Sequence, residues 1–260
     1  MTAMPELTTA RFETRGAIGV LTLNRPERMN AMTNRMVMEV HDALTVIAGM
    51  NDVRVLVLTG AGRGFCPGAD LKHFAASESD VTLRPEHFRT PVLLHRMPQV
   101  TIAAINGACA GAGFGWACAC DLRFAARSAN FTSAFLNVAS AGDMAGPWTL
   151  PRLVGAAKAR ELYLLPEKFS ADEALAIGLV SRVFADESFR AEVDAIATRL
   201  ASASPHALRT MKRNFIDAEQ MDLETYLQVE SERHMQVMAH PDAQEAFRAF
   251  VEKRPPRFGG

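Results

Sequence analysis

GAGRGFCPGADL occupies residues 60–71 of a chain of 260 residues. It directly follows VRVLVLT at residues 53–59, an apolar run rich in β-branched residues, as buried strands are. Glycine permits backbone turns in which N–H groups point outward at a ligand. The stretch lacks the spacing and the downstream acidic partner of a dinucleotide-binding fingerprint. It therefore predicts a strand-end loop that offers main-chain donors, with an ordinary turn as the alternative.

A second stretch of the same kind lies downstream. NGACAGAGFGW, residues 106–116, follows the apolar run VTIAAI at residues 100–105 and opens a predicted helix. Free N–H groups at a helix N-terminus suit an anion or a developing oxyanion, although close helix packing also needs small residues. Two such loops could hold one carbonyl oxygen between them. That arrangement is an oxyanion hole, which stabilises an enolate and makes the proton on the neighbouring carbon removable.

The surrounding sequence predicts an α/β fold. A further buried strand is predicted at residues 18–23, and Thr33 can cap the helix that follows it. The apolar face of that helix comprises Met36, Val40, Ala43, Leu44 and Ile47. Strands that alternate with helices indicate a mostly parallel sheet.

The C-terminal part has a different pattern. Residues 205–218, 223–238 and 241–253 are predicted helices with no strand between them, and residues 254–260 should be irregular. We therefore predict an α/β core over residues 1–203 and a helical region over residues 204–260 that belongs to the same functional domain.

Composition restricts the possible functions. Hydrophobic residues make up 48% and charged residues 22%, and the formal net charge of −1 indicates neither nucleic acid nor an anionic membrane as partner. We see no secretion signal and no membrane span. The four cysteines have no zinc-site spacing, so we expect small buried thiols in a reducing cytoplasm and no metal site. These cysteines are Cys66, Cys109, Cys118 and Cys120.

Six ordered motifs resemble the crotonase (enoyl-CoA hydratase/isomerase) superfamily. They are LxLNRPERMNAM (21–32), GxGxxFCxGADL (60–71), AAING (103–107), LPRLVG (150–155), AxxAxxxGLV (171–180) and FxEKRxPxF (250–258). The resemblance covers nearly the whole chain. It implies the ClpP/crotonase-like fold, a spiral of ββα units whose helical C-terminal region forms a homotrimer, often paired into a hexamer.

The resemblance also implies an acyl-CoA substrate. Its thioester carbonyl would accept hydrogen bonds from the backbone N–H groups of Ala69 and Ala112. Coenzyme A would arrive as part of the substrate, and no permanently bound cofactor is expected. The implied coenzyme A contacts are Arg28, Met29, Ala31, Gly68, Asp70, Leu71, Lys72 and Gly111, together with Phe250 and Lys253 of a neighbouring subunit. For Arg28, Lys72 and Lys253, a solvated surface charge is the alternative.

The chain departs from the resembled hydratases at their two glutamates, whose positions hold Gly115 and Phe135. Water addition needs a base and an acid, which neither residue supplies, so ordinary hydration is not expected. One carboxylate, Asp143, remains in the segment that faces the acyl group in the family. Its surroundings resemble the phenylacetate-type ring-epoxide isomerases and the Δ3,Δ2-enoyl-CoA isomerases. A turn residue or helix cap is the alternative role for Asp143.

The sequence therefore favours isomerisation by a proton shuttle through Asp143. The predicted pocket residues, for which plain core packing is the alternative, are Phe114, Gly115, Phe135, Met144 and Trp148. Such a pocket would raise the pKa of Asp143. Ring-opening C–C hydrolysis, decarboxylation, hydration and non-catalytic acyl-CoA binding stay open. So does dehalogenase-like hydrolysis with Asp143 as nucleophile, in which a histidine would assist near Phe88; we expect the adjacent His87 at the surface. The sequence has no Lys-rich helix of the kind that would indicate RNA binding.

Overall fold

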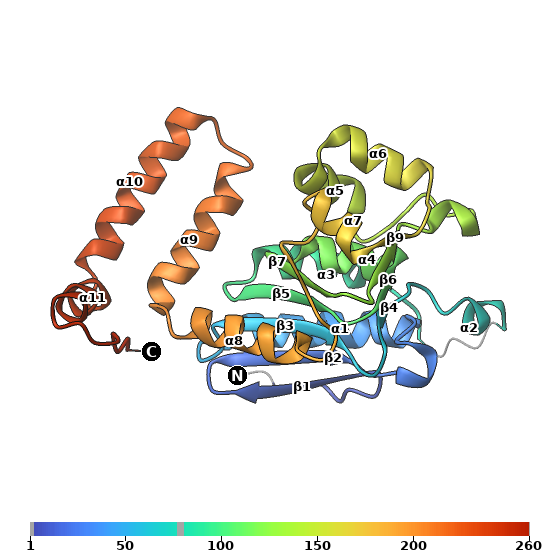
Figure 1. The fold of residues 1–260 in the computed structure, drawn as a ribbon, viewed down its shortest axis with the longest axis horizontal. Helices are drawn as coiled ribbons and strands as arrows, with labels where there is room; N and C mark the ends of the chain where they lie inside the picture. Colours follow the sequence, from blue (N-terminus) through green and yellow to red (C-terminus); the bar gives the residue numbers. More distant parts are fainter. Residues whose placement is uncertain (1–2, 77–80, 260) are drawn as a thin grey trace.

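The computed structural model describes residues 3–76 and 81–259. Its larger sheet has six strands in the order β1-β2-β3-β5-β7-β10, shown in Figure 1. Its strands are β1 (Ala10–Arg15), β2 (Ile18–Leu23), β3 (Val55–Gly60), β5 (Val100–Ile105), β7 (Leu122–Ala126) and β10 (Arg182–Phe184). Only the β1–β2 pair is antiparallel among these described strands. The predicted strands at 18–23 and 100–105 are confirmed to the residue, and β3 begins two residues later than predicted.

A smaller sheet lies beside the first. It comprises β4 (Gly64–Cys66), β6 (Ala108–Ala110), β8 (Asn130–Thr132) and β9 (Phe169–Ser170). The chain repeatedly passes from the larger sheet to the smaller one and then into a helix: β3-β4-α2, β5-β6-α4 and β7-β8-α5. This repetition is the predicted spiral of ββα units. The strands of the smaller sheet are only two or three residues long, too short for a hydrophobic period to reveal in the sequence.

Helices cover both faces of the larger sheet. The described helices before the C-terminal region are α1 (Asn34–Ala48), α2 (Leu71–Ala75), α3 (Thr90–Arg96), α4 (Gly111–Ala119), α5 (Gly146–Val154), α6 (Ala156–Leu164), α7 (Ala171–Ala176) and α8 (Phe189–Ala201), with 3-10 turns η1 (Pro26–Arg28), η2 (Pro85–Arg89) and η3 (Phe135–Val138). Thr33 caps α1 by accepting from the N–H of Met36, and the predicted apolar face of α1 is fully buried. On the opposite face, α8 packs against Val55, Val57 and Ile102. Burial on both faces explains the uniformly apolar central strands.

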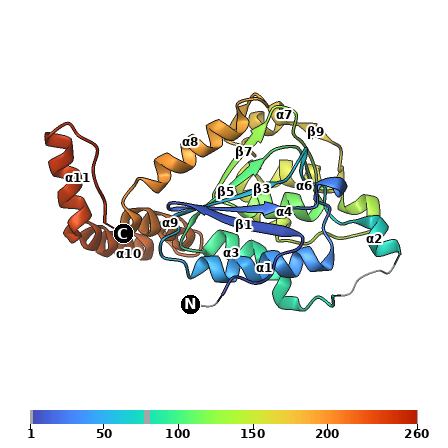
Figure 2. The same cartoon turned by 90° about the horizontal axis from the view of Figure 1, so that it is seen from below.

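The C-terminal helices extend away from the sheets in both views (Figures 1 and 2). They are α9 (Pro205–Ala218), α10 (Leu223–Ala239) and α11 (Pro241–Val251), close to the predicted bounds. The described residues after β10 hold no further strand. Lys212 attaches α9 to the core, since its ammonium lies 2.8 Å from a carboxylate oxygen of Asp121 and donates to the carbonyls of Leu94 and Gln99. The grouping of the α/β core and the C-terminal helices into one functional domain stays a prediction.

None of the described helices combines the length and the apolar character needed to cross a bilayer. The four cysteines are buried free thiols, as predicted.

Candidate active site

The two glycine-rich loops meet at Gly68 and Gly111. Both residues have positive φ angles, 93° and 51°, which favour glycine. A Cβ atom on Gly68 would lie 3.2 Å from the carbonyl oxygen of Ala110 and 3.4 Å from the Cα atom of Gly111. The backbones therefore approach closely only because side chains are absent at this crossing. Ala69 and Ala112 directly follow these two glycines in the chain.

Both alanines can offer a main-chain donor. Ala112 is the second residue of α4, and the N–H groups of a first helical turn have no partner within the helix. Its φ angle is not positive, so alanine is accommodated without backbone strain. A short parallel bridge to Met32 uses the carbonyl of Gly68 and the N–H of Asp70, and no hydrogen bond within the described chain occupies the N–H of Ala69. Two main-chain N–H groups such as those of Ala69 and Ala112 are the kind of donors that an oxyanion hole uses.

The two positions where the resembled hydratases carry glutamate are filled by apolar groups. A Cβ atom on Gly115 would lie 2.6 Å from the Cβ atom of Met144 and 2.9 Å from its carbonyl oxygen. Met144 is fixed there because its sulfur accepts a hydrogen bond of 3.2 Å from Nε1 of Trp116. The ring of Phe135 is buried and stacks on Tyr163, with ring centroids 5.8 Å apart.

Asp143 is the carboxylate that the structure brings to this region. Its Oδ1 atom is buried and has no hydrogen-bond partner among the described residues. Burial raises the pKa of Asp143, as the sequence predicted. Burial also raises the pKa of the Cys66 thiol to about 12, and the charge of Asp143 contributes to that shift. Cys66 lies two residues before Gly68, so the carboxylate is within electrostatic range of the first loop.

Comparison with known proteins agrees with this geometry. A family model described as "Enoyl-CoA hydratase/isomerase" matches residues 13–260. The chain belongs to the enoyl-CoA hydratase/isomerase family.

Several relatives in this family are similar over nearly their whole length. A "Probable enoyl-CoA hydratase" of Rhodobacter capsulatus is 37% identical, with 97% of this chain and 98% of the relative covered. The "1,2-epoxyphenylacetyl-CoA isomerase" of Escherichia coli is 36% identical, with 92% and 94% covered. A crystal structure of a "putative enoyl-CoA hydratase" from Streptomyces coelicolor has a TM-score of 0.93 at 30% identity and covers 100% of this chain and 97% of that one. Enzymes of this family act on coenzyme A thioesters, and the names of these relatives include both hydratase and isomerase.

Two asparagine side chains that the sequence analysis missed hold the first loop of this family site. Nδ2 of Asn30 donates to the carbonyls of Ala61 and Gly64 at 2.9 and 2.8 Å. Nδ2 of Asn106 donates to the carbonyl of Gly62 at 2.9 Å, and its Oδ1 accepts from the N–H of Gly60. Both asparagines lie inside motifs used for the family resemblance, but only the folded chain shows which carbonyls they reach.

Asp70, a predicted coenzyme A contact, uses its side chain within the protein. Its carboxylate accepts 2.9 Å from Nη2 of Arg25 and caps α2 by accepting from the N–H of His73. Burial alone would raise its pKa, but these two groups hold the pKa of Asp70 below its ordinary value. Arg25 was not predicted to be a site residue, and it ties the first glycine loop to the segment before η1.

The other predicted coenzyme A contacts fall into two separate regions. Arg28 and Met29 lie at the end of η1, Ala31 is buried just after it, and Leu71 and Lys72 are exposed in the first turn of α2. Leu71 and Lys72 adjoin the first loop in sequence, and the segment around Met29 packs against Gly64 of that loop in the fold.

Phe250 and Lys253 lie elsewhere. They belong to the end of α11, which is on the opposite side of the molecule from α2 in both ribbon views (Figures 1 and 2). The described part of one chain does not bring them to the loop, and their proposed role depends on a neighbouring subunit.

Two of the predicted pocket residues lie outside the group around Asp143. Phe114 is buried and packs edge-on against Phe169, with ring centroids 6.5 Å apart. Trp148 is 40% exposed and packs between His95, on α3, and the guanidinium of Arg152. It lines a groove of about 590 Å³ between α3 and α5. Gly115, Phe135 and Met144 belong to or pack against the turn that carries Asp143: Gly115 packs against Met144, and Phe135 packs against Gly142.

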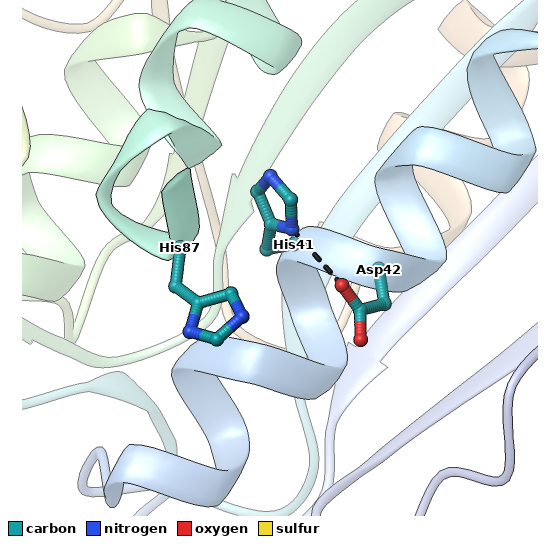
Figure 3. A group of neighbouring side chains, drawn as sticks. All are labelled: His41, Asp42 and His87. Carbon is teal, nitrogen blue, oxygen red and sulfur yellow. Dashed lines mark hydrogen bonds and ion pairs between the residues drawn. The ribbon is translucent and has the colours of Figure 1, made fainter. Parts of the chain in front are cut away.

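The expectation that His87 lies at the surface is wrong. His87 is 2% exposed and packs against His41, as Figure 3 shows, whereas Phe88 is exposed. The η2 turn folds back onto α1, and Nδ1 of His87 accepts 3.1 Å from the N–H of Arg84. Placement of this segment depends on tertiary packing and not on its local polarity.

His41, Asp42 and His87 offer ligand atoms within 4.8 Å of one another, the spacing of a possible metal site (Figure 3). A neutral imidazole that accepts at Nδ1 carries its proton on Nε2, which then cannot bind a metal. Metal-bound histidines instead donate from their second nitrogen. Nδ1 of His41 is already paired with Asp42 at 3.0 Å. These hydrogen bonds fit a packed polar cluster better than a metal centre.

Proposed function

We propose that this enzyme isomerises an unsaturated acyl-CoA by moving a proton between two carbons with Asp143. The carboxylate takes a proton from the α-carbon of a 3-enoyl-CoA, and the electron pair of the C–H bond moves into a dienolate. The N–H groups of Ala69 and Ala112 stabilise the negative oxygen. Asp143 then returns the proton to the γ-carbon, which leaves the double bond between the α- and β-carbons.

One observation carries this proposal. Asp143 has a raised pKa and a buried carboxylate oxygen with no partner among the described residues, while the two positions that correspond by resemblance to the hydratase glutamates hold Gly115 and Phe135. A single base with a raised pKa suits proton return to carbon. Hydration is the alternative that the names of several relatives suggest, and it would need a second acid–base group at this site.

The test compares Asp143→Asn with the parent on a 3-enoyl-CoA. We expect kcat to fall by about 10²- to 10⁴-fold, because the amide cannot carry the proton, while the affinity for a saturated acyl-CoA stays unchanged. Asp172→Asn, at an exposed carboxylate paired with Arg127, is the matched control and should keep full activity.

Product mass separates the reactions. Isomerisation leaves the mass unchanged, whereas hydration or hydrolysis adds one water. Retained turnover in Asp143→Asn, or a hydrated product from the parent, would overturn the proposal.

We also propose a homotrimer, or a pair of trimers, in the cytoplasm. Exposed apolar side chains gather on the C-terminal helices and support an intersubunit contact there. They include Met211, Phe215, Leu223, Met235, Phe250 and Val251. The four buried free thiols support a reducing compartment.

A further inference from the structure

The proposed mechanism does not use a buried polar group that lies against the turn carrying Asp143. The hydroxyl of Tyr163, on α6, is buried and has no hydrogen-bond partner among the described residues. Oδ1 of Asp143 is also buried and has no hydrogen-bond partner among the described residues. Unpaired buried polar groups are rare in folded proteins, and each calls for an explanation. The hydroxyl of Tyr163 can donate a hydrogen bond and Oδ1 of Asp143 can accept one, so these two groups are complementary.

The packing of Tyr163 places it against the turn that carries Asp143. Its Cε1 atom would lie 3.3 Å from a Cβ atom at Gly142, the residue before Asp143. Its hydroxyl occupies the space that a side chain at Gly146 would need. The turn between these glycines is compact, since the N–H of Gly146 approaches the carbonyl of Asp143 at 3.4 Å. The opposite face of the tyrosine ring is held by Phe135.

We infer that Tyr163 is a positioning residue for Asp143. Its hydroxyl donates to Oδ1 of the carboxylate, directly or through one water molecule, once the acyl chain is bound, and it thereby directs Oδ2 toward the substrate. The inference rests on the proposed role of Asp143. A hydrogen bond to the charged carboxylate favours that form, so Tyr163 offsets part of the effect of burial and keeps Asp143 a usable base.

Other titratable or charged groups lie on the elements packed around the pair. Burial raises the pKa of Tyr163 itself well above its ordinary value, with smaller contributions from Cys118 and Asp143, so it stays a donor. Burial also raises the thiol pKa of Cys66 on β4 and of Cys118 on α4 to about 12. On the side of α3, His95 lies against Trp148 and pairs with Glu219. Arg152 of α5 lies over the same indole.

The test is the pH dependence of kcat/KM for Tyr163→Phe, which keeps the ring stacked on Phe135 and removes only the hydroxyl. The acidic limb should move up by about one pH unit, because the carboxylate loses a donor and its pKa rises. Below the limb the rate should fall about tenfold, and well above it the rate should recover. A purely structural role would lower the rate at every pH.

Tyr226→Phe, which removes a hydroxyl bonded to Glu230 on α10, is the matched control and should leave the acidic limb of the pH profile in place.

A second readout avoids dependence on the stability of the variant. The chain has two tyrosines, so Tyr226→Phe leaves Tyr163 as the sole site for biosynthetic incorporation of 3-fluorotyrosine. A more acidic phenol donates a stronger hydrogen bond and should move the acidic limb down. An unmoved limb in both Tyr163→Phe and the fluorotyrosine enzyme would overturn the inference while Asp143→Asn still abolishes turnover. Full turnover in Asp143→Asn would instead remove the proposed function itself.

Discussion

Gly115 shows at the scale of one residue how the site excludes a glutamate. The Cβ position of residue 115 is already filled by Met144, whose backbone lies in the left-handed region with a φ angle of 50°. Moving Met144 away would also break the hydrogen bond from Trp116. The packing around residue 115 therefore excludes a glutamate side chain, in addition to the fact that glycine supplies no carboxylate.

Gly115→Glu should consequently not create a hydratase. We expect a loss of about 1–3 kcal/mol in the free energy of unfolding from overpacking, and no hydrated product from a 2-enoyl-CoA. Urea denaturation and product mass measure these two effects. Gly49→Glu, at the exposed end of α1 where a Cβ atom would meet only a backbone oxygen at 3.5 Å, is the control and should cost little. A stable Gly115→Glu enzyme that adds water would contradict this account.

At the scale of elements, the ion pair of Lys212 with Asp121 helps to join the C-terminal helices to the core. Lys212 of α9 is buried, and its ammonium pairs with Asp121 at the start of β7. Burial lowers the pKa of Lys212, and the nearby carboxylate partly restores it. Asp121 in turn accepts from the N–H and hydroxyl of Thr101 on β5, so the contact links α9 to two strands of the larger sheet.

Lys212→Met should therefore destabilise the protein by about 3 kcal/mol, because Asp121 and two carbonyls lose a buried partner. Chemical denaturation gives the change, and exposed Lys168→Met is the control with an expected effect near zero. If Lys212→Met proved as stable as Lys168→Met, the attachment of α9 would have to come from apolar contacts alone.

At the scale of the whole molecule, one chain does not complete the proposed site. Phe250 is 85% exposed and Val251 is 79% exposed, at the end of α11, and Figure 2 shows α11 on the opposite side of the molecule from α2. Exposed apolar side chains on helices that extend from the core indicate an interface. The same helices would bring Phe250 and Lys253 to the acyl-CoA of a neighbour.

Sedimentation velocity should give a mass of three or six chains. Phe250→Asp should shift the protein toward single chains and weaken acyl-CoA binding by about tenfold or more, because a charge replaces a buried aromatic contact. Leu175→Asp, at an exposed apolar residue on α7, should change neither property. A parent protein that sediments as one chain with full acyl-CoA affinity would contradict the trimer proposal.

The sequence by itself determined the family, the central strands, the C-terminal helices and the crossing of two glycine-rich loops. These features depend on local patterns: apolar runs set buried strands, and positive φ angles at Gly68 and Gly111 require glycine. It also pointed to Asp143, whose Oδ1 atom the structure shows to be buried, whereas the loss of both hydratase glutamates at Gly115 and Phe135 stays a prediction from the family resemblance.

Only the tertiary structure decided which side chains meet. The short strands of the smaller sheet, the burial of His87 and the packing of Trp148 against His95 all depend on contacts between segments far apart in the chain. The same holds for Tyr163, which lies twenty residues beyond Asp143 and comes to its turn only because α6 folds back over η3. Sequence periodicity records which face of an element is buried, and packing alone selects the neighbour that buries it.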